Sequence, residues 1–241
     1  MTQRTYFSLM RHAPTDWNKE KRIQGQIQTG IAPESRQTCL RWGEVLLEHQ
    51  ARWGEPGPMT RIVSSDLDRA VQTANLVNRA LKLPLDKDAG LREQDWGQWS
   101  GRRIRDLRAE EGEEVRKQEA LGWKFAPPGG ESRVDVRGRA WRSLQRLAGE
   151  HPGEHILIVT HLGVLKCVMY SLLKMRFLPE EGDPLLPNAV HGLVLVGGEN
   201  SSPSVENSRQ CEYAMNGNER DGFNGRYRLQ ILALNQDVLG G

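Results

Sequence analysis

The sequence predicts an α/β fold: a three-layer αβα sandwich with a mainly parallel central sheet. Short apolar runs alternate with longer segments of helical periodicity, as in sheets whose strands are joined by crossover helices. Residues 155–160 (HILIVT) are almost continuously apolar, which is typical of a parallel strand buried on both faces. Three of the apolar runs end abruptly in polar clusters, as strands do where a sheet opens onto a ligand site.

The strand candidates are short apolar or alternating runs bounded by polar residues. The last of them alternates as a strand with one solvated face does. The run beside Pro84 is expected at a sheet edge, where the missing N–H of proline is tolerated. Strands are expected at residues 6–10, 61–64, 83–86, 155–160, 190–196 and 226–234.

The helix candidates keep apolar residues at spacings of three and four. Residues 70–81 stop before Pro84, and Ser132 with Asp135 resembles a capping box that opens the next helix. Residues 104–121 are charged and carry few apolar positions, so this segment is expected to cover a site or a surface. Helices are expected around residues 40–47, 70–81, 104–121, 132–147 and 164–173.

Composition and charge exclude several classes of protein. The 241 residues are expected to form one domain, 1–241, with no repeat or linker and with a polar excursion at 197–225. A net charge of +2 argues against a dedicated nucleic-acid binder, and no apolar run approaches the ~20 residues of a membrane span. Three cysteines without a C-x-x-C spacing predict no disulfide framework. A cytoplasmic protein is expected, and a homodimer is left open.

The polar clusters that follow three strands suit a phosphoryl group. Arg11-His12 follows the first strand, Arg69 lies just beyond the second, and His161 follows the fourth. Parallel strands bring such ends to one edge of the sheet. Arginine presents forked donors to phosphate oxygens, and histidine can act as nucleophile, acid or donor. The loop at 91–97 offers Glu93 or Asp95 as an acid for the leaving group.

With these clusters in place, a specific resemblance can be stated. Residues 11–18 (RHAPTDWN) are similar to the R-H-G-x-T-x-x-N signature of the histidine phosphatase (phosphoglycerate mutase-like) superfamily. Further matching motifs follow in family order over roughly residues 6 to 196. They are a phosphate-contacting turn at Gln24-Gly25, an S-x-L-x-R-A-x-Q-T-A motif at 64–74, an acid loop at 91–101, and the segments 128–132, 159–164 and 187–189.

The resemblance implies a phosphoglycerate mutase-like fold, a helical cap at about 102–130, and roles for the matching residues. His12 is expected to attack phosphorus and form a phosphohistidine, and Glu93 to act as the acid and then the base. Cations and donors would hold the phosphoryl oxygens without a metal or a cofactor. The residues implied are His12, Glu93, Arg11, Arg69 and His161 as catalytic groups, and Thr15, Asn18, Gln24, Gly25 and Leu162 as substrate-binding groups.

Two departures from the family pattern guide the functional prediction. Ala13 replaces the usual glycine, which excludes a comfortable positive φ there but still lets the backbone approach a phosphate. Gln94-Asp95-Trp96 follows Glu93 where mutases carry a basic residue. The prediction is therefore a metal-independent histidine acid-type phosphatase acting on a small phosphorylated metabolite. The alternatives are a cofactor-dependent phosphoglycerate mutase and a catalytically weak phosphate-binding module.

Several of these side chains also have a structural interpretation. Thr15 and Asn18 can fix the turn by bonding to the backbone, and residues 64–66 are expected to cap the following helix rather than to touch substrate. The arginines of 102–108 are expected on a solvated helix face. Cys167 is expected to be inert packing in an apolar helix.

Overall fold

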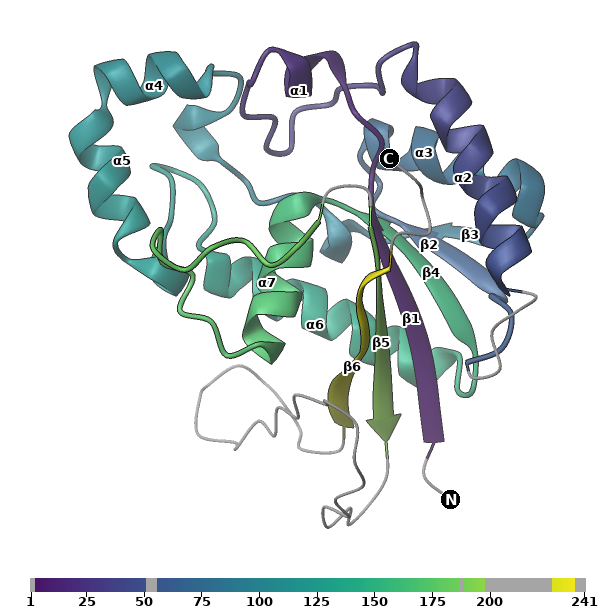
Figure 1. The fold of residues 1–241 in the computed structure, drawn as a ribbon. Helices are drawn as coiled ribbons and strands as arrows, with labels where there is room; N and C mark the ends of the chain where they lie inside the picture. The colour runs from purple at the N-terminus through teal and green to yellow at the C-terminus, as the bar shows by residue number, and fades with distance from the viewer. Residues whose placement is uncertain (1–2, 51–55, 187–188, 198–226, 237–241) are drawn as a thin grey trace.

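The computed structural model describes residues 3–50, 56–186, 189–197 and 227–236. The strands are β1 (Gln3–Arg11), β2 (Arg61–Ser64), β3 (Leu85–Lys87), β4 (His155–Thr160), β5 (Val190–Gly197) and β6 (Tyr227–Gln236). The α-helices are α1 (Asp16–Lys19), α2 (Ser35–Gln50), α3 (Asp68–Leu81), α4 (Ile104–Glu110), α5 (Gly112–Glu119), α6 (Arg133–Glu150) and α7 (Leu162–Leu172). Figure 1 shows the six strands as one sheet with helices on both of its faces.

The sheet has the strand order β3-β2-β4-β1-β5-β6. Strands β3, β2, β4 and β1 pair in parallel, whereas β5 runs antiparallel to β1 and β6 antiparallel to β5. The prediction of a mainly parallel sheet is confirmed, and β3 lies at the edge as expected for the run beside Pro84. Because β1, β2 and β4 are parallel neighbours, their carboxyl ends open at the same end of the sheet.

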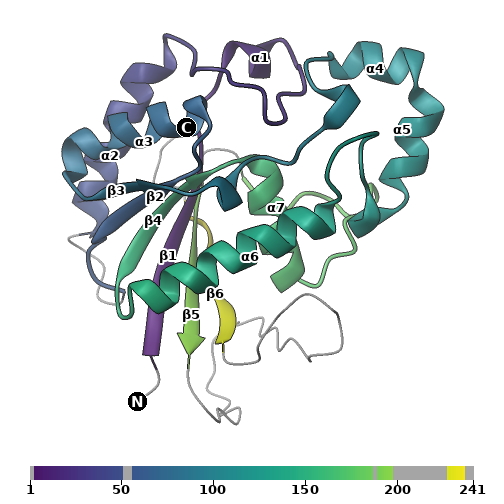
Figure 2. The ribbon, with the colours of Figure 1, turned by 180° about the vertical axis from the view of Figure 1, so that it is seen from behind.

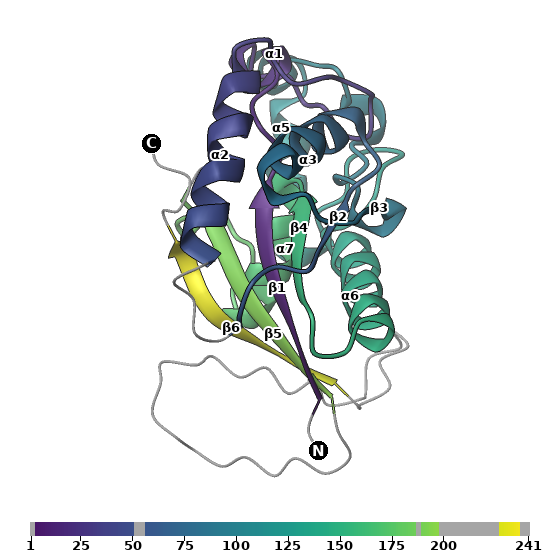
Figure 3. The same ribbon diagram turned by 90° about the vertical axis from the view of Figure 1, so that its right-hand side faces the viewer.

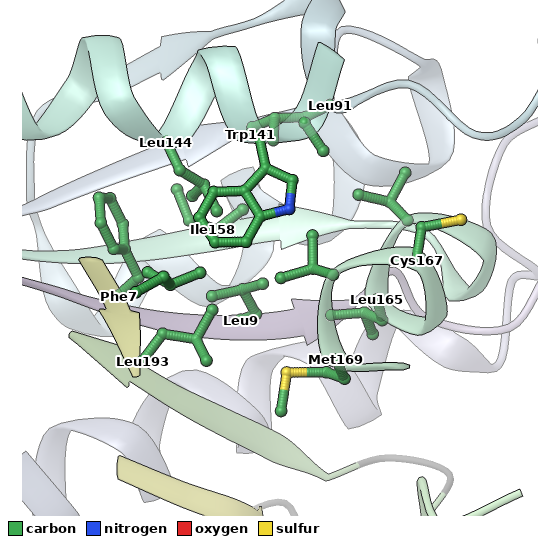
Figure 4. Close-up of a cluster of buried hydrophobic side chains, with 14 of the residues drawn as sticks. Phe7, Leu9, Leu91, Trp141, Leu144, Ile158, Leu165, Cys167, Met169 and Leu193 are labelled. Atoms are coloured by element: carbon green, nitrogen blue, oxygen red, sulfur yellow. The ribbon is translucent and has the colours of Figure 1, made fainter. Parts of the chain in front are cut away.

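Each face of the sheet buries alternate residues of the central strands. Ile158 of β4 packs with Phe7 and Leu9 of β1 against α6 and α7, where Figure 4 shows Trp141 and Leu165 meeting these strand side chains. The intervening residues of β4 pack against α2 and α3, which cover the opposite face (Figure 3). A strand buried on both faces needs a continuous apolar sequence, which explains the composition of residues 155–160.

The region expected as one charged helix at 104–121 forms two helices, α4 and α5. The helical path breaks at Glu111, whose backbone adopts φ −126° and ψ 29°. Its carboxylate is held there by Trp99 Nε1 at 3.0 Å and by the guanidinium of Arg102. Figure 2 shows both helices projecting beyond the end of the sheet at which the parallel strands terminate, and we call α4 and α5 the cap.

The structure bears on three further expectations from the sequence: the capping box of α6, the start of α7 and the absence of a membrane span. The capping box of α6 is present, with Ser132 Oγ donating to Asp135 at 2.6 Å and accepting from its N–H at 3.1 Å. Helix α7 begins two residues earlier than expected, directly after His161. The polar excursion at 197–225 lies almost entirely outside the described residues. In the described part of the chain, no helix combines the length and apolarity that a membrane crossing requires.

Candidate functional site

The pairing of β1 with β4 brings the two predicted histidines together. Arg11 is the register partner of Thr160, and the His12 N–H donates to the Thr160 carbonyl oxygen at 2.9 Å. His161 directly follows Thr160, the last residue of β4, and the centroid of its ring lies 5.1 Å from that of the His12 ring. Two sequence clusters, one near the start of the chain and one in its second half, therefore form one site.

The hydrogen bond of His12 fixes which ring nitrogen is free. His12 Nδ1 lies 2.7 Å from the carbonyl oxygen of Ala13, which can only accept, so Nδ1 carries the proton. In a neutral imidazole this leaves the lone pair on Nε2. Burial, and then the charges of Arg11 and Arg69, hold the pKa of His12 well below its ordinary value. A neutral ring with an unprotonated Nε2 is the form that a nucleophile requires.

Arg69 lies fully buried on the first turn of α3. Its Nη2 donates to the Gly25 carbonyl oxygen at 2.7 Å and its Nη1 to that of Ile27 at 3.0 Å. Gly25 has a φ of +52°, a conformation that favours glycine, so this turn offers its carbonyl without strain. Burial lowers the pKa of Arg69 to about 10, which leaves the side chain a cation at neutral pH.

Three buried nitrogens at this end of the sheet have no hydrogen-bond partner among the described residues: Arg11 Nε, Arg69 Nε and His161 Nδ1. Buried polar atoms are normally paired, and an unpaired one marks a place that a ligand or an ion can satisfy. Two of these nitrogens belong to cations. An oxyanion therefore matches both their charge and their donor capacity.

His161 is completely buried, and its Nε2 lies 2.8 Å from Ser65 Oγ. Burial is the largest cause that lowers the pKa of His161, followed by the nearby His12 and Arg69. Ser65 Oγ also accepts from the N–H of Leu67 at 3.3 Å, so the expected link to the start of α3 is present. The residue at the cap position is Leu67, however, and Asp66 pairs instead with Arg92 at 2.5 Å.

Glu93 approaches this site from the loop between β3 and the cap. Its Oε1 accepts from the N–H of Gln94 at 2.8 Å and its Oε2 from the N–H of Gly163 at 3.2 Å. A Cβ atom at position 163 would collide with Glu93 Oε1. The absence of a side chain at Gly163 therefore leaves room for the Glu93 carboxylate at the start of α7.

The side chains gather around a cavity of about 320 Å³, a volume within the range of small-molecule sites. Of the ten predicted site residues, eight line it: Arg11, His12, Asn18, Gln24, Gly25, Arg69, Glu93 and Leu162. His161 is not part of this lining and lies beside His12. Asp95, the competing acid, does not line the cavity, and its Oδ1 accepts from the N–H of Gly97 at 2.9 Å.

Thr15 is the predicted substrate-binding residue that the structure does not bring to the cavity. Its hydroxyl accepts from the Asn18 N–H at 3.2 Å, and its own N–H donates to Asn18 Oδ1 at 3.0 Å. This capping box closes the turn at α1, as the structural interpretation expects. Asn18 takes part in the same turn and also lines the cavity.

Ala13 fits its position in the site without strain. It is completely buried and does not adopt a positive φ, so a methyl group is compatible with the backbone. Its N–H donates to Thr73 Oγ1 at 3.0 Å, while its carbonyl oxygen orients His12. Alanine in place of the family's glycine is therefore compatible with the hydrogen bond between Ala13 and His12.

The sequence did not predict two sets of residues. One set holds the loop that carries Glu93, and the other lines the part of the cavity near the cap. Arg139 and Glu131 hold the loop, while Phe125, Arg133 and Phe177 line the cavity. These residues come from α6 and from irregular segments, so no periodicity marks them, and of the five only Glu131 stands in one of the matching motifs, at 128–132. Thr73 could have been predicted as a site residue, since it belongs to the motif at 64–74. Cys167 is buried, as expected, and burial raises the pKa of its thiol to about 12, yet it also lines the cavity.

Comparisons with known proteins agree with this geometry. A sequence profile of the histidine phosphatase superfamily (branch 1) matches residues 7–197. Glucosyl-3-phosphoglycerate phosphatase of Mycobacterium tuberculosis is 32% identical over 176 residues, which cover 69% of this chain and 74% of that protein. A probable phosphoglycerate mutase of Salmonella choleraesuis is 34% identical over 166 residues, covering 68% and 73%.

Solved structures show the same likeness. A mycobacterial glucosyl-3-phosphoglycerate phosphatase in complex with vanadate (VO3) superimposes with a TM-score of 0.65 at 30% identity, covering 78% of this chain and 90% of that chain. YhfR of Bacillus stearothermophilus gives a TM-score of 0.68 at 29% identity with the same coverage. The α-ribazole phosphatase of Shigella flexneri gives 0.63 at 25% identity, covering 78% and 89%.

Proposed function

Since the chain belongs to the histidine phosphatase superfamily, we propose that it is a metal-independent phosphatase that hydrolyses a small phosphomonoester through a phosphohistidine on His12. The observation that carries this proposal is the His12 hydrogen bond. A neutral ring whose Nδ1–H donates to the Ala13 carbonyl oxygen at 2.7 Å presents an unprotonated Nε2 in the field of the Arg11 and Arg69 charges. Two named relatives, a phosphatase and a probable mutase, share the superfamily and support phosphoryl-transfer chemistry.

In the first step His12 Nε2 attacks phosphorus, the bond between phosphorus and the ester oxygen breaks, and that oxygen takes the proton of Glu93. The alcohol leaves and the phosphoryl group stays on His12. Arg11 and Arg69 stabilise the charge that spreads over the equatorial oxygens, with Asn18 and His161 as further donors. Because these groups are already held in place, positioning supplies much of the rate.

In the second step water attacks the phosphohistidine. Glu93, now a carboxylate, takes the proton of that water, the bond between phosphorus and Nε2 breaks, and inorganic phosphate forms. His12 returns to its neutral form and Glu93 to its protonated form. The backbone N–H groups of Gln94 and Gly163 fix the carboxylate at one place for both steps.

The residues after Glu93 favour a phosphatase over a mutase. Gln94 is buried, and its Nε2 donates to the Glu131 carbonyl oxygen at 2.7 Å. The side chain that follows is Asp95, so this stretch offers no cation to the second acidic group of a phosphoglycerate. A mutase needs to hold such a group while the phosphoryl group returns.

The test is hydrolysis of 4-nitrophenyl phosphate between pH 4 and pH 9 in excess EDTA, with wild type and His12→Ala compared. The proposal expects EDTA-insensitive turnover that the substitution abolishes. Isomerisation of phosphoglycerate after bisphosphoglycerate priming, faster than hydrolysis, would instead identify a mutase. Binding of phosphate or vanadate without turnover in either assay would leave a phosphate-binding module.

Three finer features belong to the same proposal. We expect an acid-type phosphatase, because the lowered pKa of His12 keeps its ring neutral, and therefore nucleophilic, below neutral pH.

The two buried cysteines that the structure describes, Cys39 and Cys167, are unpaired thiols, which supports a location in a reducing compartment such as the cytoplasm. The proposed partner is a small phosphorylated metabolite, with no nucleic acid or membrane, and gel filtration would test for a homodimer.

A further inference from the structure

The cavity that holds the phosphate site continues under the cap, where its lining becomes mainly apolar. Ile104 and Leu107 of α4 and Val115 of α5 line it, together with the rings of Trp96, Trp99, Phe125 and Phe177. Leu107, Val115, Trp99 and Phe125 belong to one buried cluster, against which Trp96 packs. We call this part of the cavity the cap subsite.

The rings of the cap subsite pack against one another and still leave apolar surface uncovered. The Trp96 ring centroid lies 5.4 Å from that of Phe125 in an edge-on arrangement, and Trp99 lies 6.1 Å from Phe125. Trp96 and Phe177 are only half-buried, and Ile104 is 44% exposed. Apolar surface of this kind inside a cavity gains most from an apolar ligand group.

Three of the cations that line the cavity already have carboxylate partners. Arg108 Nη2 lies 2.8 Å from Glu119, in an ion pair that joins α4 to α5. Lys166 Nζ lies 2.7 Å from Asp183, and Arg22 Nε lies 2.6 Å from Glu20. A second anionic group on a substrate would have to compete with these internal carboxylates.

Arg133 has no carboxylate partner among the described residues, but its guanidinium is enclosed in another way. It lies over the ring of Phe125 at 4.2 Å and over that of Phe177 at 4.0 Å. Its Nη1 donates to the carbonyl oxygens of Gly122 at 3.0 Å and Phe177 at 3.1 Å. Phe177 holds this position with a φ of 67°, a conformation that a bulky residue rarely adopts.

We propose that the cap subsite binds an uncharged, flat apolar leaving group, so that the preferred substrates are phosphomonoesters of aromatic or aryl-alkyl alcohols rather than phosphorylated acids or polyols. This inference rests on the proposed phosphatase function and assigns its substrate class. The phosphate end of the cavity supplies charge recognition, and the cap subsite supplies selectivity through apolar contact.

The test compares three ligands whose phosphate group sits on a primary alcohol or its equivalent: 2-phenylethyl phosphate, glycerol 1-phosphate and 3-phosphoglycerate, with inorganic phosphate as reference. Dissociation constants are measured by calorimetry on the full chain carrying His12→Ala, so the result does not depend on turnover. Burying a phenyl ring predicts that 2-phenylethyl phosphate binds about tenfold tighter than glycerol 1-phosphate. The proposal predicts no gain for 3-phosphoglycerate over inorganic phosphate.

Substitutions in the cap test whether the cap subsite causes the preference for 2-phenylethyl phosphate. Ile104→Ser should remove several-fold of the preference for 2-phenylethyl phosphate, because Ile104 is an exposed wall residue whose loss leaves the fold intact. Leu121→Ser is the matched control, since Leu121 is 50% exposed near the end of the cap and does not line the cavity. The control should keep the preference of the parent.

Two results would overturn the substrate class. Equal affinity for 2-phenylethyl phosphate and glycerol 1-phosphate would show that the cap subsite makes no contact with the leaving group. Tight binding of 3-phosphoglycerate that Arg133→Met abolishes would show that Arg133 holds a substrate carboxylate. Neither result bears on the phosphatase function, which the wild-type hydrolysis assay with His12→Ala decides separately.

Discussion

Arg139 Nη2 donates a hydrogen bond to the backbone carbonyl oxygen of Glu93 at 2.9 Å. The same guanidinium donates from Nη1 to the Gly90 carbonyl oxygen at 2.9 Å and from Nε to Glu131 at 2.9 Å. Glu131 in turn accepts from the N–H of Asp95 at 2.9 Å. Helix α6 therefore holds the loop that carries the proposed acid at several points.

Replacing Arg139 should impair catalysis through the position of Glu93. Arg139→Met removes the bonds that set the loop, and a displacement of about 1 Å can cost as much as 100-fold in rate. We expect kcat to fall by about 10- to 100-fold while the inhibition constant for inorganic phosphate stays unchanged. Steady-state kinetics with phosphate inhibition measure both quantities.

The matched control is Arg142→Met on the same helix, at an exposed position. It should leave kcat at the wild-type value. An equal loss in both variants, or a loss of phosphate affinity with kcat retained, would contradict a positioning role for Arg139.

Gly163→Ala should separate protonation of the leaving group from attack on phosphorus. The added methyl group meets the Glu93 carboxylate and displaces it. General acid catalysis contributes about 100-fold or more, so kcat/KM for an alkyl phosphate, which reports the steps up to release of the alcohol, should fall by about that factor. The kcat/KM for 4-nitrophenyl phosphate, whose leaving group needs no proton, should fall far less.

Gly182→Ala is the control for this substitution, because nothing lies within 4 Å of a Cβ atom at that position. It should leave both substrates unaffected. If Gly163→Ala lowers kcat/KM for both substrates to the same degree, Glu93 does not act as the acid.

Ala13→Gly should restore the family's residue without raising activity. Ala13 does not use a positive φ, so glycine adds only backbone freedom, which costs about 1 kcal/mol of stability. We expect an unchanged kcat/KM and a lower Tm. A large gain in kcat would mean that alanine disables turnover, as the binding-module alternative supposes.

The stability of the protein should fall as the pH drops below that at which an unfolded histidine titrates. Burial lowers the pKa of His12, His155, His161 and His191, the last to about 4. Unfolded histidines, with a pKa near 6.5, bind protons that the folded ones do not, so each contributes stability above pH ~6.5 that is lost on acidification.

For His191 alone the difference amounts to about 2 kcal/mol at pH 5. Urea unfolding at pH 7.5 and pH 5 should therefore show a fall that His191→Gln reduces by about that amount. His49→Gln, at the half-exposed end of α2, serves as the control. A fall of the same size with His191→Gln as in wild type would contradict this account of the pH dependence.

The fold was largely predictable because local patterns and the global topology agree. The apolar run at 155–160 is typical of a strand buried on both faces, and the polar ends of β1, β2 and β4 meet because those strands run in parallel. Eight of the ten predicted site residues line one cavity for this reason. Ordered motifs identified the family from the same residues.

The remainder depends on contacts that no local pattern encodes. Arg139 meets Glu93 across 46 residues, and Phe177 meets Arg133 across 44. The break at Glu111 depends on the partners of its carboxylate in another segment. Thr15 carries a family motif position, yet its hydroxyl is used within the turn itself.

Rapid-quench trapping with an isotopically labelled phosphomonoester tests the phosphohistidine mechanism most sharply. This mechanism predicts an acid-labile, base-stable phosphoryl group on His12 in wild type, which forms and decays at rates that permit the observed turnover. His12→Ala should show neither the phosphoryl group nor hydrolysis. Turnover in wild type with no phosphoenzyme formed, together with activity retained in His12→Ala, would contradict the phosphohistidine mechanism.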